Sequence, residues 1–214
     1  MSRANIANRI VEAGAVAVIR LNGGERVLQV AEALLEGGVT VMEITLTTPG
    51  ALHHIENLSR QFGQSILIGA GSVLGREATL RAVNAGARFV VSPVVDPRVV
   101  EAAHESGVPA IPGAFTPTEA QTANAFGADI VKLFPAHCLG KNFIPALLAP
   151  LPHLRLMPTG GVRPETAGDW ICAGAAAVGI GGALVGRDAV AEGRLDVIAD
   201  RARIACRSIA VARA

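Results

Sequence analysis

Lys132 is the residue whose type and surroundings point most directly to chemistry. The chain contains 17 arginines but only two lysines, and Lys132 interrupts the apolar run 130–134. Strand alternation predicts that Val131 and Leu133 face covering helices while Lys132 faces the interior. An apolar site disfavours the ammonium ion, so a buried amine can attack a ketone, which an arginine cannot do. The alternatives are a lysine that reaches the mouth of the fold or one that neutralises a carboxylate.

Glu43 is the second residue with a chemical signature. It lies between Met42 and Ile44 in an apolar run, so alternation also directs its side chain to the interior. An acid and an amine that face the same apolar interior suggest an acid/base group beside a nucleophile. A structural ion pair between Glu43 and Lys132 is the alternative, and the two interpretations are compatible.

Two glycine pairs form a third candidate site, for an anion. Gly160 and Gly161 follow the predicted strand 155–158, and Gly181 and Gly182 follow the predicted strand 177–180. Loops after the last two strands of a (β/α)₈ barrel often bind phosphate through exposed backbone N–H groups. The alternative is that these glycines only permit tight turns.

The elements that position these residues recur with a period of about 20–25 residues, in which a helix ends at a glycine and a short apolar run follows. This alternation predicts a parallel sheet of eight strands. Helices are expected to begin near Gly24, Pro49, Arg76, Pro97, Pro117, Asn142, Pro164 and Asp188. We therefore predict one α/β domain over residues 1–214, a closed (β/α)₈ TIM barrel with a short N-terminal helix. An open, doubly wound sheet is the alternative.

Composition narrows the function further. The formal net charge is +1, which provides no field to attract nucleic acid or an anionic membrane. The three cysteines have no paired spacing, which is typical of reduced thiols in a cytoplasmic protein. No apolar run approaches the length of a membrane span. The pair His53 and His54 has no further ligand at a suitable spacing, so no metal site is predicted.

The sequence resembles the family of 2-keto-3-deoxy-6-phosphogluconate (KDPG) and 4-hydroxy-2-oxoglutarate (KHG) aldolases. The resemblance spans nearly the whole chain and rests on eight segments in order: VAVIR (16–20), EGGVTVMEITLTTPGA (36–51), GAGSVL (69–74), FVVSP (89–93), IPGAFTPTEA (111–120), DIVKLFPA (129–136), MPTGGV (157–162) and VGIGGALV (178–185). It implies a class I aldolase without a cofactor, commonly a homotrimer, that acts on a small phosphorylated keto acid.

The resemblance also implies roles for individual residues. Lys132 would form the Schiff base and Glu43 would serve as acid and base. The glycine pairs Gly160–Gly161 and Gly181–Gly182 would hold the phosphate. The residues implied to line the keto-acid pocket are Ser72, Pro93, Phe134 and Thr159.

Two departures from the family pattern bear on substrate binding. Many members have an arginine four residues after the catalytic glutamate, where this chain has Thr47, and the usual GAGTV segment has Ser72 in place of threonine. The substrate carboxylate still needs a cation in an apolar interior. Arg20 ends the first predicted strand, beside the strand of Glu43, and is predicted to bind that carboxylate. Thr47 and Ser72 are also expected to be substrate-binding residues, and without Arg20 the carboxylate would be left to their hydroxyls and the local backbone. The alternative is a solvated arginine at the rim.

These observations predict cleavage of KDPG to pyruvate and glyceraldehyde 3-phosphate, with KHG as a further substrate. Three alternatives remain open. The substrate could belong to the galactonate series. A phosphosugar isomerase or epimerase could share the barrel and the glycine loops without a lone buried lysine. A non-catalytic barrel that binds a phosphorylated metabolite would explain the fold and the loops only.

Overall fold

Helices and strands alternate along the chain in the computed structural model, which describes residues 1–214. The strands are β1 (Ala15–Ile19), β2 (Val41–Thr45), β3 (Leu67–Gly71), β4 (Val90–Val91), β5 (Ala110–Ile111), β6 (Gly113–Ala114), β7 (Val131–Leu133), β8 (Leu156–Pro158) and β9 (Val178–Ile180). All eight predicted strands are present. The fifth of them is followed by a further short strand, since β5 ends before Pro112 and β6 begins after it, because proline has no N–H to give to a ladder.

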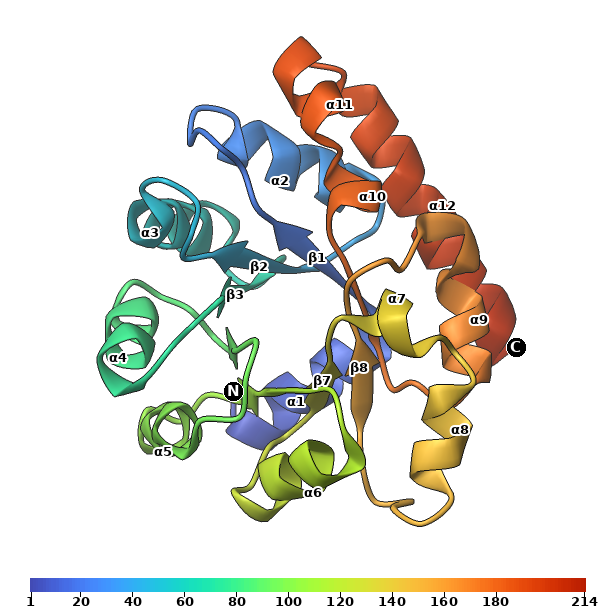
Figure 1. Ribbon diagram of the computed structural model, residues 1–214. Coiled ribbons are helices and arrows are strands. Elements are labelled where there is room, and N and C mark those ends of the chain that lie inside the picture. The colour runs from blue at the N-terminus through green and yellow to red at the C-terminus, as the bar shows by residue number, and fades with distance from the viewer.

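The helices surround these strands (Figure 1). They are α1 (Arg3–Ala13), α2 (Val27–Glu36), α3 (Ala51–Phe62), α4 (Arg76–Asn84), α5 (Pro97–Glu105), α6 (Pro117–Ala125), α7 (Ala136–Leu139), α8 (Phe143–Leu148), α9 (Ala167–Cys172), α10 (Gly182–Val185), α11 (Arg187–Glu192) and α12 (Leu195–Arg213), with a 3₁₀ helix at Pro164–Thr166. The predicted N-terminal helix is present, whereas the short helices α7 and α10 were not predicted.

Local chemistry explains where the helices begin. Asp96 accepts a hydrogen bond from the backbone N–H of Arg98 at 2.9 Å, and Pro97 occupies the first turn of α5. Thr116 and Glu119 form a reciprocal capping box at the start of α6. The predicted starts near Gly24 and Pro49 were too early, because α2 begins at Val27 and α3 at Ala51.

The strands pair in parallel throughout, which confirms the predicted α/β class. Their order is β5-β4-β3-β2-β1-β9 in a six-stranded sheet and β6-β7-β8 in a three-stranded sheet. The predicted closed (β/α)₈ barrel is therefore not formed as one continuous sheet. Pro112 separates the sheets on one side, and on the other side a single parallel bridge joins Thr159 to Gly179.

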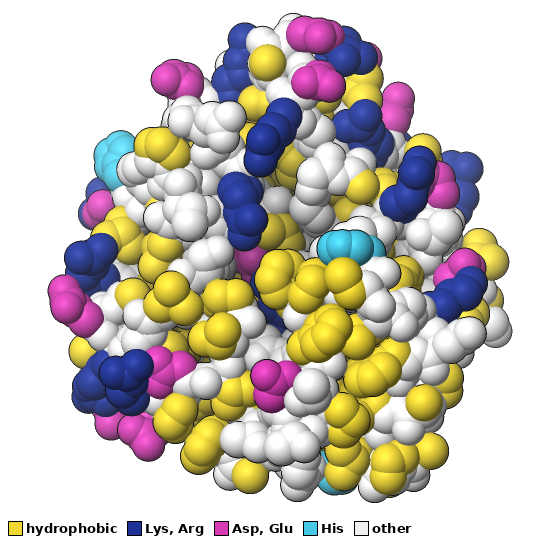
Figure 2. Space-filling model, in the orientation of Figure 1, with side chains coloured by type: hydrophobic (Ala, Val, Ile, Leu, Met, Phe, Trp, Pro, Cys, Tyr) yellow, Lys and Arg dark blue, Asp and Glu magenta, His cyan; other side chains and the backbone are white.

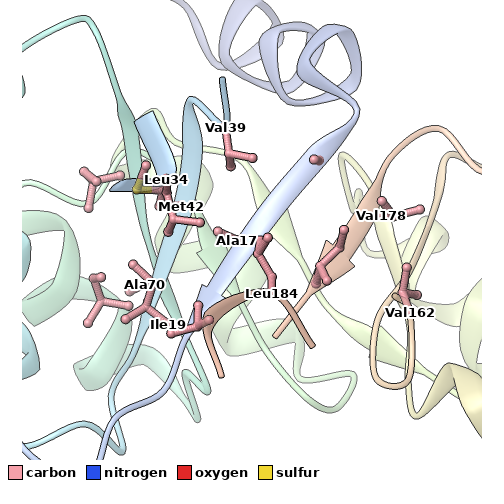
Figure 3. Close-up of a cluster of buried hydrophobic side chains, with 14 of the residues drawn as sticks. Ala17, Ile19, Leu34, Val39, Met42, Ala70, Val162, Val178 and Leu184 are labelled. Carbon is pink, nitrogen blue, oxygen red and sulfur yellow. The ribbon is translucent and has the colours of Figure 1, made fainter. Parts of the chain in front are cut away.

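Alternation divides the apolar side chains between two clusters. The larger cluster lies between strands and helices; Figure 3 shows part of it, including Ala17, Met42 and Val178. The smaller cluster contains side chains of the opposite strand face, such as Val16 and Met157, together with Ile6 and Ile10 of α1. Because Figure 1 shows α1 behind the strands, we place the smaller cluster inside the ring, with α1 covering its far end.

The C-terminal helix α12 buries one apolar face against its neighbours. In α12, the buried side chains include Ile198, Ala202, Ala205 and Ile209, and the helix lies against α2 and α9. Whereas α1 lies behind the strands, only short helices such as α7 and α10 lie near the opposite end of the ring, at the carboxyl ends of the strands (Figure 1).

Candidate active site

A cavity of about 370 Å³ lies at the carboxyl ends of the strands. Its walls come from the segments that follow β1, β7, β8 and β9, and include Arg20, Lys132, Thr159 and Gly181. Figure 2 shows a hollow at the centre of this face, with acidic and basic side chains deep within it. The volume is in the range of small-molecule sites.

Lys132 is held by the middle of β7. Its neighbours Val131 and Leu133 belong to the larger apolar cluster, between the strands and the helices. Lys132 therefore projects from the opposite face of β7, toward the inside of the ring, and lines the cavity. Only 5% of the residue is exposed. The Nζ atom lies 4.9 Å from the centroid of the Phe134 ring, a cation–π distance. An amine is thus fixed at the floor of a cavity that opens to solvent.

Glu43 is buried more deeply, with 1% of the residue exposed. Neither carboxylate oxygen has a hydrogen-bond partner. Gly71 of the neighbouring strand makes room for it, because a Cβ atom there would lie 2.5 Å from Oε1 of Glu43. No hydrogen bond joins Glu43 to Lys132, although the positive charge of Lys132 acts on the Glu43 carboxyl. A buried carboxylate without such partners calls for a functional explanation.

Burial raises the pKa of the Glu43 carboxyl above its ordinary value of 4.5. The positive charges of Lys132 and Arg20 oppose this shift, and burial outweighs both of them. A carboxyl group with a raised pKa can exchange protons nearer to neutral pH than an exposed one. Glu43 therefore has the environment of an acid/base group.

The two glycine pairs lie on one wall of the cavity. Gly160 and Gly161 have φ values of +90° and +86°, and a Cβ atom on Gly161 would lie 2.4 Å from Cβ of His137. The loop is also fixed by a hydrogen bond that the His137 backbone N–H donates to the Gly160 carbonyl at 2.9 Å. In contrast, a Cβ atom on Gly182 would meet nothing within 4 Å.

The remaining predicted pocket residues divide into two groups. Arg20, Phe134 and Thr159 line the same cavity as Lys132, and Thr159 is buried. Arg20 donates a 3.4 Å hydrogen bond to the hydroxyl of Ser72. Pro93 and Ser72 themselves are not part of the cavity wall.

Thr47, like Ser72 and Pro93, does not line this cavity. Thr47 is exposed, lies outside the cavity and shares a hydrogen bond of 3.0 Å with the hydroxyl of Thr45. The reason is that β2 ends at Thr45 and the chain then turns, with the Thr48 N–H donating to the Thr45 carbonyl. Thr47 had been placed from the family pattern, in which an arginine stands at this position, and not from strand alternation.

Sequence reasoning missed Arg187. This exposed residue lines the cavity beside Gly186, at the start of α11 and directly after α10, which begins at Gly182. A basic residue so soon after a predicted phosphate loop was the available signal. No group of three or more His, Cys, Asp or Glu side chains is arranged to hold a metal ion. None of the helices combines the length and apolar character needed to cross a membrane.

The geometry agrees with comparisons to known proteins. The sequence profile of the KDPG and KHG aldolases matches residues 6–200. The chain belongs to this family. As a family member it is a carbon–carbon lyase, an aldolase.

Individual relatives show how broad this aldolase similarity is. The chain is 38% identical over 170 residues to a probable 2-dehydro-3-deoxy-6-phosphogalactonate aldolase of Rhizobium meliloti, covering 79% of this chain and 80% of that protein. It is 40% identical over 157 residues to the 2-dehydro-3-deoxy-phosphogluconate aldolase of Treponema pallidum, covering 73% of this chain and 74% of that protein.

A solved structure is similar in fold as well. The KDPG aldolase of Legionella pneumophila, with pyruvate captured at low pH as a covalent carbinolamine intermediate, superposes with a TM-score of 0.84 at 30% identity. The match covers 92% of this chain and 96% of that one. A carbinolamine is the adduct of an amine with a ketone, and attack of an amine on a ketone is the reaction expected of Lys132.

Proposed function

We propose that this chain is a class I aldolase that cleaves 2-keto-3-deoxy-6-phosphogluconate to pyruvate and glyceraldehyde 3-phosphate. One observation carries the proposal. Lys132 opens into a cavity from a buried strand position, and the nearby Glu43 carboxyl is buried with no hydrogen-bond partner. A binding protein would gain nothing from burying an unpartnered carboxyl group, since that is costly.

The reaction begins at Lys132. Its neutral amine adds to the C2 ketone, the resulting carbinolamine loses water, and an iminium forms between Nζ and C2. Phe134, whose ring lies beside Nζ, stabilises positive charge at this point. The iminium then accepts the electron pair of the C3–C4 bond, so no metal or organic cofactor is required.

Glu43 moves the protons. As a carboxylate it accepts the proton of the C4 hydroxyl, directly or through a water molecule, while the C3–C4 bond breaks and the aldehyde leaves. The enamine that remains on Lys132 takes this proton back at C3. Water then hydrolyses the iminium and releases pyruvate. The raised pKa of Glu43 suits both steps, because the same group must accept and return a proton.

Two sets of groups are assigned to the anionic ends of the substrate, and Thr159 to its middle. Arg20 binds the C1 carboxylate, because it lines the cavity and its charge acts on Glu43. The backbone N–H groups of Gly160–Gly161 and Gly181–Gly182 bind the C6 phosphate. Thr159 faces the middle of the substrate from between them.

Relatives that act on the gluconate and galactonate series are similar to this chain to nearly the same degree. The two series differ at C4, and we propose the gluconate configuration, with KHG as a slower substrate. The purified protein should release pyruvate from KDPG faster than from the galactonate isomer, measured through lactate dehydrogenase. A higher kcat/KM for the galactonate isomer would reverse the assignment, and no pyruvate from any of the three would overturn the aldolase.

We also infer that the two sheets act as one closed (β/α)₈ barrel in a single domain over residues 1–214. The bridge from Thr159 to Gly179 and the continuity of the chain through Pro112 support this closure. A homotrimer is proposed from the family resemblance. The exposed side chains of Val94 and Phe115 are available to a second copy. Light scattering on the purified protein measures the trimer directly. The cytoplasmic location stays a prediction.

A further inference from the structure

The cavity carries more positive charge than its chemistry at C2 requires. Arg20, Lys132 and Arg187 line it, whereas the carboxyl group of Glu43 is buried and is not part of the wall. Arg187 takes part in no ion pair with an acidic residue, whereas many arginines elsewhere on the surface do. A guanidinium that faces a cavity without a protein partner is available to an anionic ligand.

The three cations are not equivalent in position. Lys132 and Arg20 both act on the charge of Glu43, and Arg187 does not contribute to it. Arg187 instead follows Gly186 at the start of α11, directly after the short helix α10 that begins at Gly182. Arg187 is therefore the cation of the cavity wall that is nearest in the chain to a glycine pair assigned to the phosphate.

The rest of this wall cannot neutralise an anion. Ala183 and Val185 have no polar side-chain atom, and the glycines provide only backbone N–H groups. A phosphate monoester carries a charge of about −1.5 to −2 at neutral pH. Guanidinium groups suit such an anion because they can donate two parallel hydrogen bonds.

We propose that Arg187 is the residue that makes this site prefer phosphorylated substrates, by pairing with the terminal phosphate. The inference rests on the proposed aldolase function and adds to it a side chain that selects the substrate class. Arg187 should strengthen the binding only of ligands that carry the terminal phosphate, because the substrate carboxylate is assigned to Arg20.

A matched pair of variants isolates this role. Arg187→Ala removes the cation from the cavity. Arg26→Ala removes a second arginine that lies beside Arg187 in a neighbouring hollow but does not line the cavity, and that also has no acidic partner. Arg187→Lys keeps the charge and loses the fork-shaped donor.

For Arg187→Ala we expect KM for KDPG to rise roughly 10- to 100-fold, the range of charged hydrogen bonds. The KM for KHG, which has no phosphate, should stay within about twofold, and so should the yield of the pyruvate adduct on Lys132. Arg187→Lys should recover part of the loss, and Arg26→Ala should match the wild type on both substrates. Inhibition by inorganic phosphate should weaken in Arg187→Ala alone.

Equal losses on both substrates, equal effects of the two alanine variants, or an unchanged KM for KDPG would each overturn the proposal. If the wild-type protein forms no pyruvate adduct and cleaves neither substrate, the aldolase function fails. Calorimetric titration with inorganic phosphate then still tests Arg187, because binding that is unchanged in Arg187→Ala contradicts its role whatever the reaction is.

Discussion

The burial of Glu43 connects catalysis to stability at the scale of a single residue. The folded protein keeps this carboxyl protonated to a higher pH than the unfolded chain does, because burial raises its pKa. The folded state therefore binds more protons, and the free energy of unfolding falls as pH rises from 4.5 through the raised pKa. Catalysis by the carboxylate needs the same deprotonation, so activity and stability should move in opposite directions.

Glu43→Gln separates these effects. Its kcat should fall by about 10²–10⁴ while the pyruvate adduct still forms. Relative to the wild type, its free energy of unfolding should improve as pH rises above 4.5, because glutamine has no proton to lose. Urea unfolding at several pH values measures this difference. A variant with wild-type kcat, or a stability difference that does not change with pH, would show that Glu43 is not the buried acid/base group.

Arg20 tests the carboxylate end of the site. Arg20→Ala should raise the KM of KDPG, of KHG and of pyruvate itself by roughly tenfold, because all three present the same carboxylate beside the ketone. This pattern differs from that of Arg187, which should affect the phosphorylated substrate alone. Steady-state kinetics on the three ligands distinguish them. Unchanged KM values for all three would assign the carboxylate to neutral hydroxyl and backbone groups instead.

Lys132 and Glu43 could be found in the sequence because a charged residue inside an apolar strand breaks a pattern of period two, and this pattern fixes which face it occupies. Thr47 and Arg187 could not, because Thr47 lies in the turn after β2 and Arg187 at the start of the short helix α11, where strand alternation does not fix the direction of a side chain. Ser72 shows the same limit, since it has a positive φ of 59° just after β3.

The turns after β8 and β9 differ as elements, although each contains a glycine pair. Gly161 is required by its backbone and by its contact with His137, so that a larger residue there would strain the loop. Gly182 has open space beside it and lines the cavity. The sequence GG alone does not distinguish a glycine that permits a turn from one that leaves room for a ligand.

Gly182→Val is therefore the cleaner test of the phosphate loop. It should raise KM for KDPG at least tenfold, through steric exclusion of the phosphate, while the melting temperature and the KM for KHG change little. Gly161→Val should instead lower the melting temperature, because of its φ of +86° and the collision with His137. Comparable losses on KDPG and KHG in Gly182→Val would mean that this turn does not hold the phosphate.

At the scale of the whole molecule, the interior depends on α1. Ile6 and Ile10 are fully buried and join side chains from the strands in the inner cluster. The sequence predicted this helix but not its packing, because its apolar residues are few and their partners come from the whole length of the chain. The division of the strands into two sheets was also not predictable, since it depends on one proline and one isolated bridge.

Ile10→Ala should destabilise the protein by about 2–5 kcal/mol, the usual cost of removing a buried isoleucine side chain. Asn5→Ala, an exposed change on the same helix, is the control and should leave stability nearly unchanged. Thermal and urea unfolding measure both. An Ile10→Ala protein as stable as the control would show that α1 does not close the interior.

The most direct test of the Schiff-base mechanism is covalent capture of pyruvate at Lys132. The protein is incubated with pyruvate and borohydride, digested, and mapped by mass spectrometry, with Lys132→Arg as the control because arginine forms no iminium. Lys141, the only other lysine, is half-exposed and paired with Asp169 at 2.8 Å, so it provides an internal comparison. Schiff-base chemistry at Lys132 predicts a reduced pyruvyl adduct on this lysine alone. Labelling of Lys141 instead, or no adduct on the wild-type protein, would contradict it.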